Sequence, residues 1–205
     1  LAEQGYSPEY GARELRRTVD RLVSHPLSDL LLAGEFAKGD TVGVLLEDGI
    51  LSQLKDAGLD EIRINIAANG YDLSPAVLAG SYINKVTVEI PCIPEDLETL
   101  KTVLPEMERS GIDFLNIHQL SLEEQNCREL VSRPYHFTGQ GKGISIYESE
   151  ICALELLLYA CEQGVSLPIN YCSSIYKQRY QGRGFRKQRA SAFPDPAGEL
   201  TEAGY

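Results

Sequence analysis

Five cysteines are the residues of this chain with the most chemical potential, because thiolates bind metals and act as nucleophiles. They are Cys92, Cys127, Cys152, Cys161 and Cys172. No two lie closer than nine positions, so the chain lacks the C-x-x-C spacing of a compact zinc site and predicts no metal centre. An odd number of separated cysteines also argues against a disulfide framework and predicts a reducing, cytoplasmic location. We expect them to pack mainly as small core residues.

A cluster of positive charge occupies a late segment, since no Asp or Glu occurs between positions 163 and 194. Its cations are Lys177, Arg179, Arg183, Arg186, Lys187 and Arg189. Interleaved Tyr180 and Phe185 are typical of a loop that binds nucleic acid or phosphate. Alternatively, the basic strip covers an acidic face of the protein or meets an anionic substrate. A formal net charge of −11 for the whole chain disfavours nucleic acid and anionic membrane as partners.

Size and composition indicate an ordinary globular protein. The 205 residues are 43% hydrophobic and 24% charged, which suits one domain or one domain with an appendage. No apolar run is long enough for a membrane helix, and the first residues do not form an export signal. The first residue is Leu1 rather than Met, from which we expect a piece of something longer.

Two organisations meet near residue 50. The first 49 residues predict a helical hairpin followed by a strand at 41–46, with Pro26 stopping or kinking the helix and residues 47–49 forming a turn. Beyond them, strands at 61–66, 85–90, 113–118 and 167–172 alternate with helices at 51–58, 97–107 and 147–163. This alternation predicts parallel βαβ units and an α/β fold.

Two polar residues in these strands merit attention. Glu89 lies inside an apolar strand, so it faces either a polar barrel interior, which we favour, or solvent. His118 ends a strand, where barrel enzymes place functional groups, and its roles as ligand contact or as structural imidazole remain equally open. His25 and His136 lie beside or near prolines and predict loops.

Residues 1–49 resemble the end of a Clp-type AAA+ unfoldase, the small C-terminal subdomain of its second ATPase module. The resemblance rests on the ordered motifs GYSPEYGARELRR (5–17), PLS (26–28), GEF (34–36) and GD (39–40). It implies that Arg13 is the sensor arginine that reaches a neighbouring nucleotide phosphate. On spacing alone, Arg13 and the nearby arginines would be a solvated helix face. The sequence contains no GxxxxGK[ST] loop, so ATP contact is expected only through Arg13 in a complete ring.

Residues 51–205 resemble the later part of a radical S-adenosylmethionine enzyme related to pyruvate-formate-lyase-activating enzymes. The motifs are LKDAGLDEIR (54–63), VEIPCIP (88–94), DFLNIH (113–118) and NYCSSIYK (170–177). The resemblance implies half of a (β/α) barrel, strands four to six, that holds S-adenosylmethionine at its strand ends. By position, the candidates for this wall are Arg63, Asn65, Glu89, Asn116 and His118.

The chain is therefore interpreted as a composite of a Clp-like segment, 1–49, and a radical-enzyme-like segment, 51–205. The intact radical family uses a CxxxCxxC motif to hold a [4Fe–4S] cluster, and this sequence contains no such triplet. We therefore expect an incomplete, inactive radical enzyme with an unknown small-molecule or protein substrate. The competing hypothesis is an assembly or nucleotide-sensing module, derived from an ATP-dependent protease chaperone subunit, that associates with AAA+ protomers.

Overall fold

The computed structural model describes residues 13–35, 46–140, 143–192 and 201 of the chain. These residues fall into two compact units, whose bounds differ from the division expected near residue 50. Unit 1 comprises Leu1–Val88 and Met107–Phe114, and unit 2 comprises Glu89–Glu106 and Leu115–Tyr205. Within the described ranges, no helix is long and apolar enough to cross a membrane.

The first described segment of unit 1 is helical from Arg13 to Leu32. It consists of α1 (Arg13–Val19), a π-helical turn η1 (Asp20–Ser24) and α2 (His25–Leu32). Helical backbone dihedrals at Val19 and His25 join the three, so the predicted hairpin reversal is wrong. Pro26 does not stop the helix, because the wider π turn before it accommodates a ring that would clash with the carbonyl four residues earlier. For the same reason His25, predicted in a loop, is helical.

The region after residue 45 begins with a helix instead of the predicted turn. Glu47 is extended and precedes α3 (Asp48–Asp56), with Asp48 in its first turn, where a carboxylate favours the helix dipole. The strand predicted at 41–46 and the turn at 39–40 fall outside the described residues, apart from Leu46, which lies outside any strand. Helix α3 ends at Ala57, and Gly58 has a φ of 92°, a conformation that favours glycine.

The rest of unit 1 contains the first strands of the sheet. Strand β1 (Glu61–Ile64) is followed by a 3₁₀ turn η2 (Ala67–Asn69), helix α4 (Ser74–Gly80) and strand β2 (Lys85–Pro91), whose last three residues belong to unit 2. Strands β1 and β2 are parallel, with Glu61 opposite Lys85 and Ile64 opposite Val88. The sequence did not predict α4, whose seven residues are too few to show a helical period.

Unit 2 continues with η3 (Pro94–Asp96), helix α5 (Leu97–Arg109), whose last turn returns to unit 1, and strand β3 (Phe114–His118). Helix α6 (Cys127–Val131) precedes an antiparallel hairpin of β4 (Phe137–Gln140) and β5 (Gly143–Ile146). Helix α7 (Tyr147–Glu162) and strand β6 (Ile169–Cys172) follow, and β6 lies parallel to β3. Short α8 (Ser174–Tyr176), π-helical η4 (Lys177–Gln181) and α9 (Gly182–Ala192) complete the described chain.

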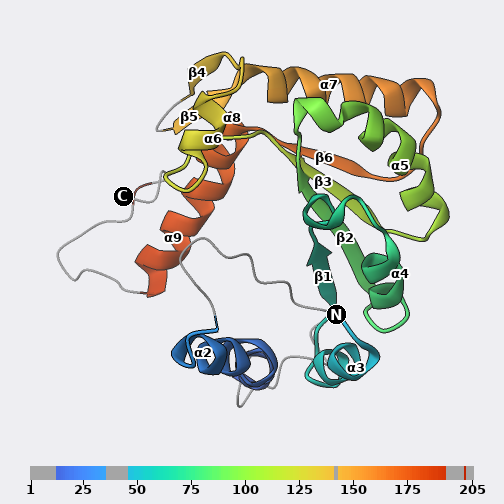
Figure 1. Ribbon diagram of the computed structural model, residues 1–205, viewed down its shortest axis with the longest axis vertical. Coiled ribbons are helices and arrows are strands. Elements are labelled where there is room, and N and C mark those ends of the chain that lie inside the picture. The colour runs from blue at the N-terminus through green and yellow to red at the C-terminus, as the bar shows by residue number, and fades with distance from the viewer. Residues whose placement is uncertain (1–12, 36–45, 141–142, 193–200, 202–205) are drawn as a thin grey trace. The chain divides into compact units, whose positions relative to one another are not determined.

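The hydrogen-bonded order of the main sheet is β1-β2-β3-β6, as Figure 1 shows. The printed pairs are parallel, so the predicted α/β class with βαβ units is confirmed. Alternate residues of the strands are buried, which places Val86, Val88 and Ile64 in the core of unit 1 and Ile90, Leu115 and Ile117 in the core of unit 2. The intervening polar residues therefore share the opposite face of their strands.

Candidate functional site

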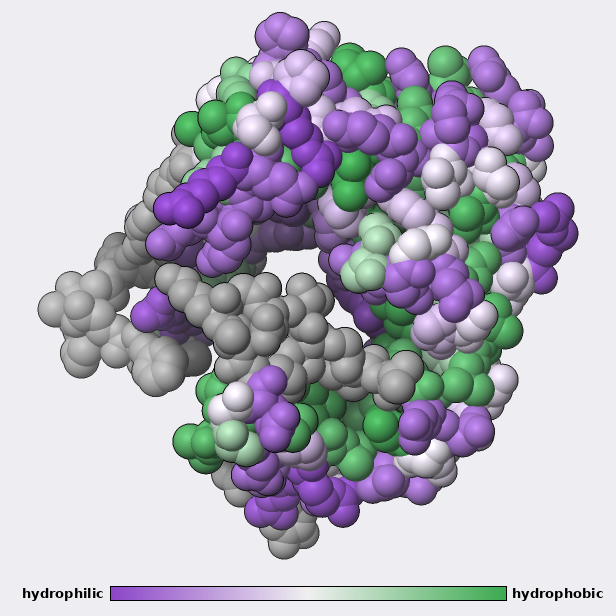
Figure 2. Space-filling model, in the orientation of Figure 1, coloured by the Kyte–Doolittle hydropathy of each residue, from purple (hydrophilic) through white to green (hydrophobic). Residues whose placement is uncertain are grey.

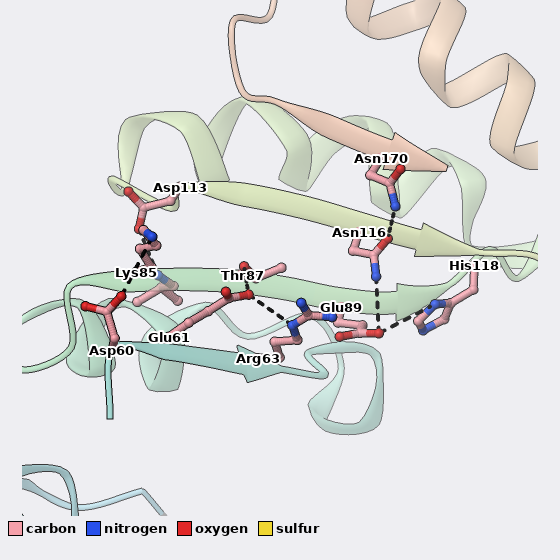
Figure 3. Close-up of polar contacts among 11 residues, drawn as sticks. Asp60, Glu61, Arg63, Lys85, Thr87, Glu89, Asp113, Asn116, His118 and Asn170 are labelled. Atoms are coloured by element: carbon pink, nitrogen blue, oxygen red, sulfur yellow. Dashed lines mark hydrogen bonds and ion pairs between the residues drawn. The ribbon is translucent and has the colours of Figure 1, made fainter. Parts of the chain in front are cut away.

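The candidate site in unit 2 is a row of polar side chains at the carboxyl ends of neighbouring strands. Glu89, Asn116 and His118 alternate with the buried Ile90, Leu115 and Ile117 described above. Asn170 of β6 lies opposite Asn116 of β3 and shares its face. The period of two along each strand therefore gathers the row on one face, where Figure 3 shows these side chains turned toward one another.

Hydrogen bonds link this row into a relay. Asn170 Nδ2 donates to Asn116 Oδ1 at 2.7 Å, and Asn116 Nδ2 donates to Glu89 Oε1 at 3.2 Å (Figure 3). The Asn116 amide is thus oriented by a partner on each side. Donation to the Glu89 carboxylate stabilises its ionised form.

His118 completes the row from the end of β3. Its Nδ1 lies 3.8 Å from Glu89 Oε1, and the two side chains are 24% and 27% exposed. This distance permits an ion pair when the imidazole is protonated, and partial burial strengthens it relative to a fully exposed pair. The backbone carbonyl of His118 also accepts a 2.8 Å hydrogen bond from the Cys92 N–H, which fixes the strand end beneath the ring.

The two candidates on β1 and after it belong to unit 1, where their described contacts are local. Arg63 Nε lies 3.0 Å from Glu61 Oε1, an oxygen that also accepts from Thr87 Oγ1 at 3.1 Å (Figure 3). The Asn65 side-chain oxygen accepts a 3.0 Å hydrogen bond from the Ala67 N–H, where the 3₁₀ turn η2 begins. The structure brings Glu89, Asn116 and His118 together, and Arg63 and Asn65 stay predictions for the same wall.

Of the remaining predicted residues, Arg13 opens helix α1, and its side chain lies outside the described part of the chain. Arg16 and Arg17 of α1 are exposed, and Arg17 lies 3.8 Å from Glu14 in an ion pair between exposed side chains. The basic segment is helical, so its prediction as a loop is wrong. Hydrophilic side chains gather over α9 in Figure 2. Its long Arg, Lys and Gln side chains favour helix strongly enough to retain Gly182 and Gly184 within it.

The sequence missed two features of unit 2. Asn170 was quoted in a motif but not selected, although a polar residue in a short apolar strand could have identified it. The second feature is a cleft beside α7, at which His136 contacts Glu148 through a 2.5 Å Nδ1–Oε1 distance. Burial raises the pKa of Glu148, but hydrogen bonds from the His136 ring and backbone outweigh it and leave the pKa below its ordinary value. Their separation in sequence hid this pair.

The described residues do not fit a [4Fe–4S] cluster. Cys92, Cys152 and Cys172 are buried, Cys127 is partly exposed and Cys161 is exposed. Nowhere in the described ranges do three potential metal ligands converge. Cys172, a candidate for packing, is covered by Gln181, whose Nε2 lies 3.3 Å from its sulfur.

Comparisons with known proteins divide the chain in the way its motifs do. The family model for the C-terminal, D2-small domain of ClpB protein matches residues 1–44. The chloroplastic chaperone protein ClpD of Arabidopsis thaliana is 56% identical over 48 residues, which are 23% of this chain and 5% of ClpD. The chaperone protein ClpB of Rhodopseudomonas palustris is 44% identical over 52 residues, 25% of this chain and 6% of that protein.

A second similarity covers most of the chain. A protein of Methanocaldococcus jannaschii described as a candidate glycyl-radical enzyme activating enzyme is 35% identical over 165 residues. The match covers 75% of this chain and 42% of that protein, so the chain spans less than half of that relative's length. No solved structure matches. The chain thus resembles both a Clp chaperone domain and a radical S-adenosylmethionine activating enzyme, and these matches support a fusion or chimera.

Proposed function

We propose that the polar row of unit 2 forms part of a wall that binds the adenosyl portion of S-adenosylmethionine, within half of a radical-enzyme-like (β/α) barrel. The observation that carries the proposal is the relay Asn170–Asn116–Glu89 at the carboxyl ends of parallel strands. Ligands of parallel α/β folds bind at that end of the strands. Similarity to the M. jannaschii protein supports the choice of cofactor.

The residue chemistry suits a nucleoside. The ribose of an adenosyl group presents two neighbouring hydroxyl donors, and a carboxylate accepts from such a pair. Asn116 holds the Glu89 carboxylate in place, while Asn170 orients Asn116. His118 offers a second polar group 3.8 Å from the same carboxylate. Arg63 and Asn65 of unit 1 are proposed contacts to the same ligand.

We further propose that these 205 residues bind the cofactor without cleaving it. When bound beside a reduced [4Fe–4S] cluster, S-adenosylmethionine supplies a carbon radical. The widely spaced cysteines do not provide the three ligands that such a cluster needs. Anaerobic reconstitution with iron and sulfide is therefore expected to yield no four-iron EPR signal and no S-adenosylmethionine cleavage, and either signal would contradict this step.

Isothermal titration calorimetry with S-adenosylhomocysteine, which lacks the reactive sulfonium, tests binding by itself. Glu89→Gln should weaken binding by about tenfold, the loss of a charge-assisted hydrogen bond of roughly 1.5 kcal/mol. The matched control is Glu106→Gln, an exposed carboxylate of α5 outside the polar row. Equal affinities for the two variants, or no binding by the parent, would reject the proposed wall.

A second function is supported by the exposed leucines of α2. Leu30, Leu31 and Leu32 are 44%, 64% and 86% exposed, and Figure 2 shows hydrophobic atoms on the surface over this helix. Because residues 1–44 match the ClpB D2-small domain, we propose that this face packs on a Clp-type AAA+ protomer. Co-elution with a Clp ATPase in size-exclusion chromatography, lost in Leu31→Asp, is expected. Separate elution under every nucleotide condition would reject this function.

A further inference from the structure

A cleft of about 450 Å³ opens beside helix α7 within unit 2. Its lining includes His136, Glu148, Ile151, Cys152, Glu155 and Leu97. The apolar side chains give it a hydrophobic floor, whereas the two glutamates give it negative charge. One of its lining atoms belongs to a thiol, which is the most nucleophilic side chain that a protein carries when ionised.

A second thiol lies directly behind the first. Cys92 is fully buried and Cys152 is 2% exposed, and the two thiols hydrogen-bond to each other. Cys152 Sγ also lies 3.6 Å from the backbone oxygen of Ile93, the residue after Cys92. One turn earlier in α7, Ser149 Oγ donates to the Cys92 carbonyl at 2.6 Å. These bonds hold the helix against the segment after β2, so the thiol contact is built into the packing.

We propose that Cys152 and Cys92 form a reactive dithiol site for small cationic disulfides, which enter through the cleft and leave the two cysteines cross-linked. The Cys152 thiolate attacks one sulfur of the reagent disulfide and expels the other half as a thiol, which takes up the proton that Cys152 gave up. Cys92 then loses its proton and attacks the Cys152 sulfur, so that the second half leaves as a thiol. Two protein thiols are oxidised and one reagent disulfide is reduced to two thiols.

The order of attack follows from position and from hydrogen bonding. Cys152 lines the cleft, whereas Cys92 has no exposed surface. The hydrogen bond from Cys92 lowers the pKa of the Cys152 thiol against the opposing effect of burial. The same hydrogen bond, together with burial, raises the pKa of Cys92. Cys152 is therefore the attacking residue and Cys92 the resolving residue.

Charge decides which disulfides react. Glu148 and Glu155 both line the cleft, and Glu148 is in contact with His136. A carboxylate roughly 7 Å from a reagent charge changes its local concentration by about threefold or more in a solvated cleft. Cystamine, which is dicationic, should therefore react at least about threefold faster than oxidised glutathione, which is anionic, and Glu155→Gln should reduce that ratio.

The test uses the full chain with Cys127→Ser and Cys161→Ser, which removes the two thiols that are not buried. Cystamine should cause the loss of two hydrogens per chain, and peptide mapping should identify a Cys92–Cys152 link. Adding Cys92→Ser should trap the cystamine adduct on Cys152, and adding Cys152→Ser should leave Cys92 unmodified. Cys172→Ser, which removes a buried cysteine outside the pair, is the matched control and should preserve the cross-link.

Three results would overturn the site. They are a lasting adduct on Cys152 while Cys92 is present, modification of Cys92 at the parental rate in Cys152→Ser, and equal rates with cystamine and oxidised glutathione. Circular dichroism of each variant identifies one that does not fold. In that case peptide mapping of the background protein decides the question, since any cross-link other than Cys92–Cys152 contradicts the proposal.

Discussion

Replacing Ser149 with alanine should destabilise unit 2 far more than the loss of one hydroxyl from a surface would. Ser149 has no exposed surface. Its hydroxyl donates to the Cys92 carbonyl at 2.6 Å and accepts from the Leu120 N–H at 2.8 Å. One side chain of α7 thus satisfies backbone groups from the segments that follow β2 and β3, the two strands that carry Glu89 and His118.

The expected magnitude follows from these two bonds. Ser149→Ala leaves one buried carbonyl and one buried N–H without this partner, each at a cost of about 1–2 kcal/mol, so the free energy of unfolding should fall by about 2–4 kcal/mol. Urea unfolding followed by circular dichroism measures the change, with an unchanged slope showing that the denatured state is the same. We also expect weaker S-adenosylhomocysteine binding, because the carboxyl ends of the two strands lose a shared anchor.

Ser132→Ala is the control for this experiment. Ser132 is exposed, and its hydroxyl donates only to the Glu129 carbonyl in the same helical turn, so its loss should change stability by less than about 0.5 kcal/mol. If Ser149→Ala changes the free energy of unfolding as little as Ser132→Ala does, the hydroxyl does not join the two segments, and the reasoning from buried hydrogen bonds fails.

Three further predictions concern other parts of unit 2. Burial raises the pKa of Glu148 but hydrogen bonds from His136 lower it more, so its stabilising effect is present above the unfolded pKa of about 4.3 and lost as pH falls through the folded value; urea midpoints between pH 7 and 3 should therefore fall more steeply in the parent than in Glu148→Gln. Tyr171→Phe should leave stability unchanged or raise it by up to about 1 kcal/mol in the same assay, because among the described residues this hydroxyl is buried without a hydrogen-bond partner. Retention on a single-stranded DNA column should be negligible at physiological salt and the same after Arg183→Gln and Arg186→Gln, because the whole chain carries a net charge of −11; salt-dependent retention lost in the double variant would contradict this.

The sequence predicted the main strands because each carries a period of two. In β2, Val86, Val88 and Ile90 alternate with polar residues, and that pattern requires an extended chain with one buried face. The same pattern singled out Glu89 and His118 before their contact was known. The prediction failed where elements are short or lack such a period, as in the seven-residue helix α4 and in the basic segment that forms η4 and α9.

Residue identity by itself determined that the chain combines two unlike segments and contains no CxxxCxxC triplet, because motifs and spacings are properties of the linear chain. It also determined which face of each strand is polar. Only the tertiary structure decided that Asn170 supports Asn116, that His136 meets Glu148, and that Cys92 touches Cys152. These partners are separated by 54, 12 and 60 positions, and contacts at such separations depend on strand pairing and helix packing, which no local pattern specifies.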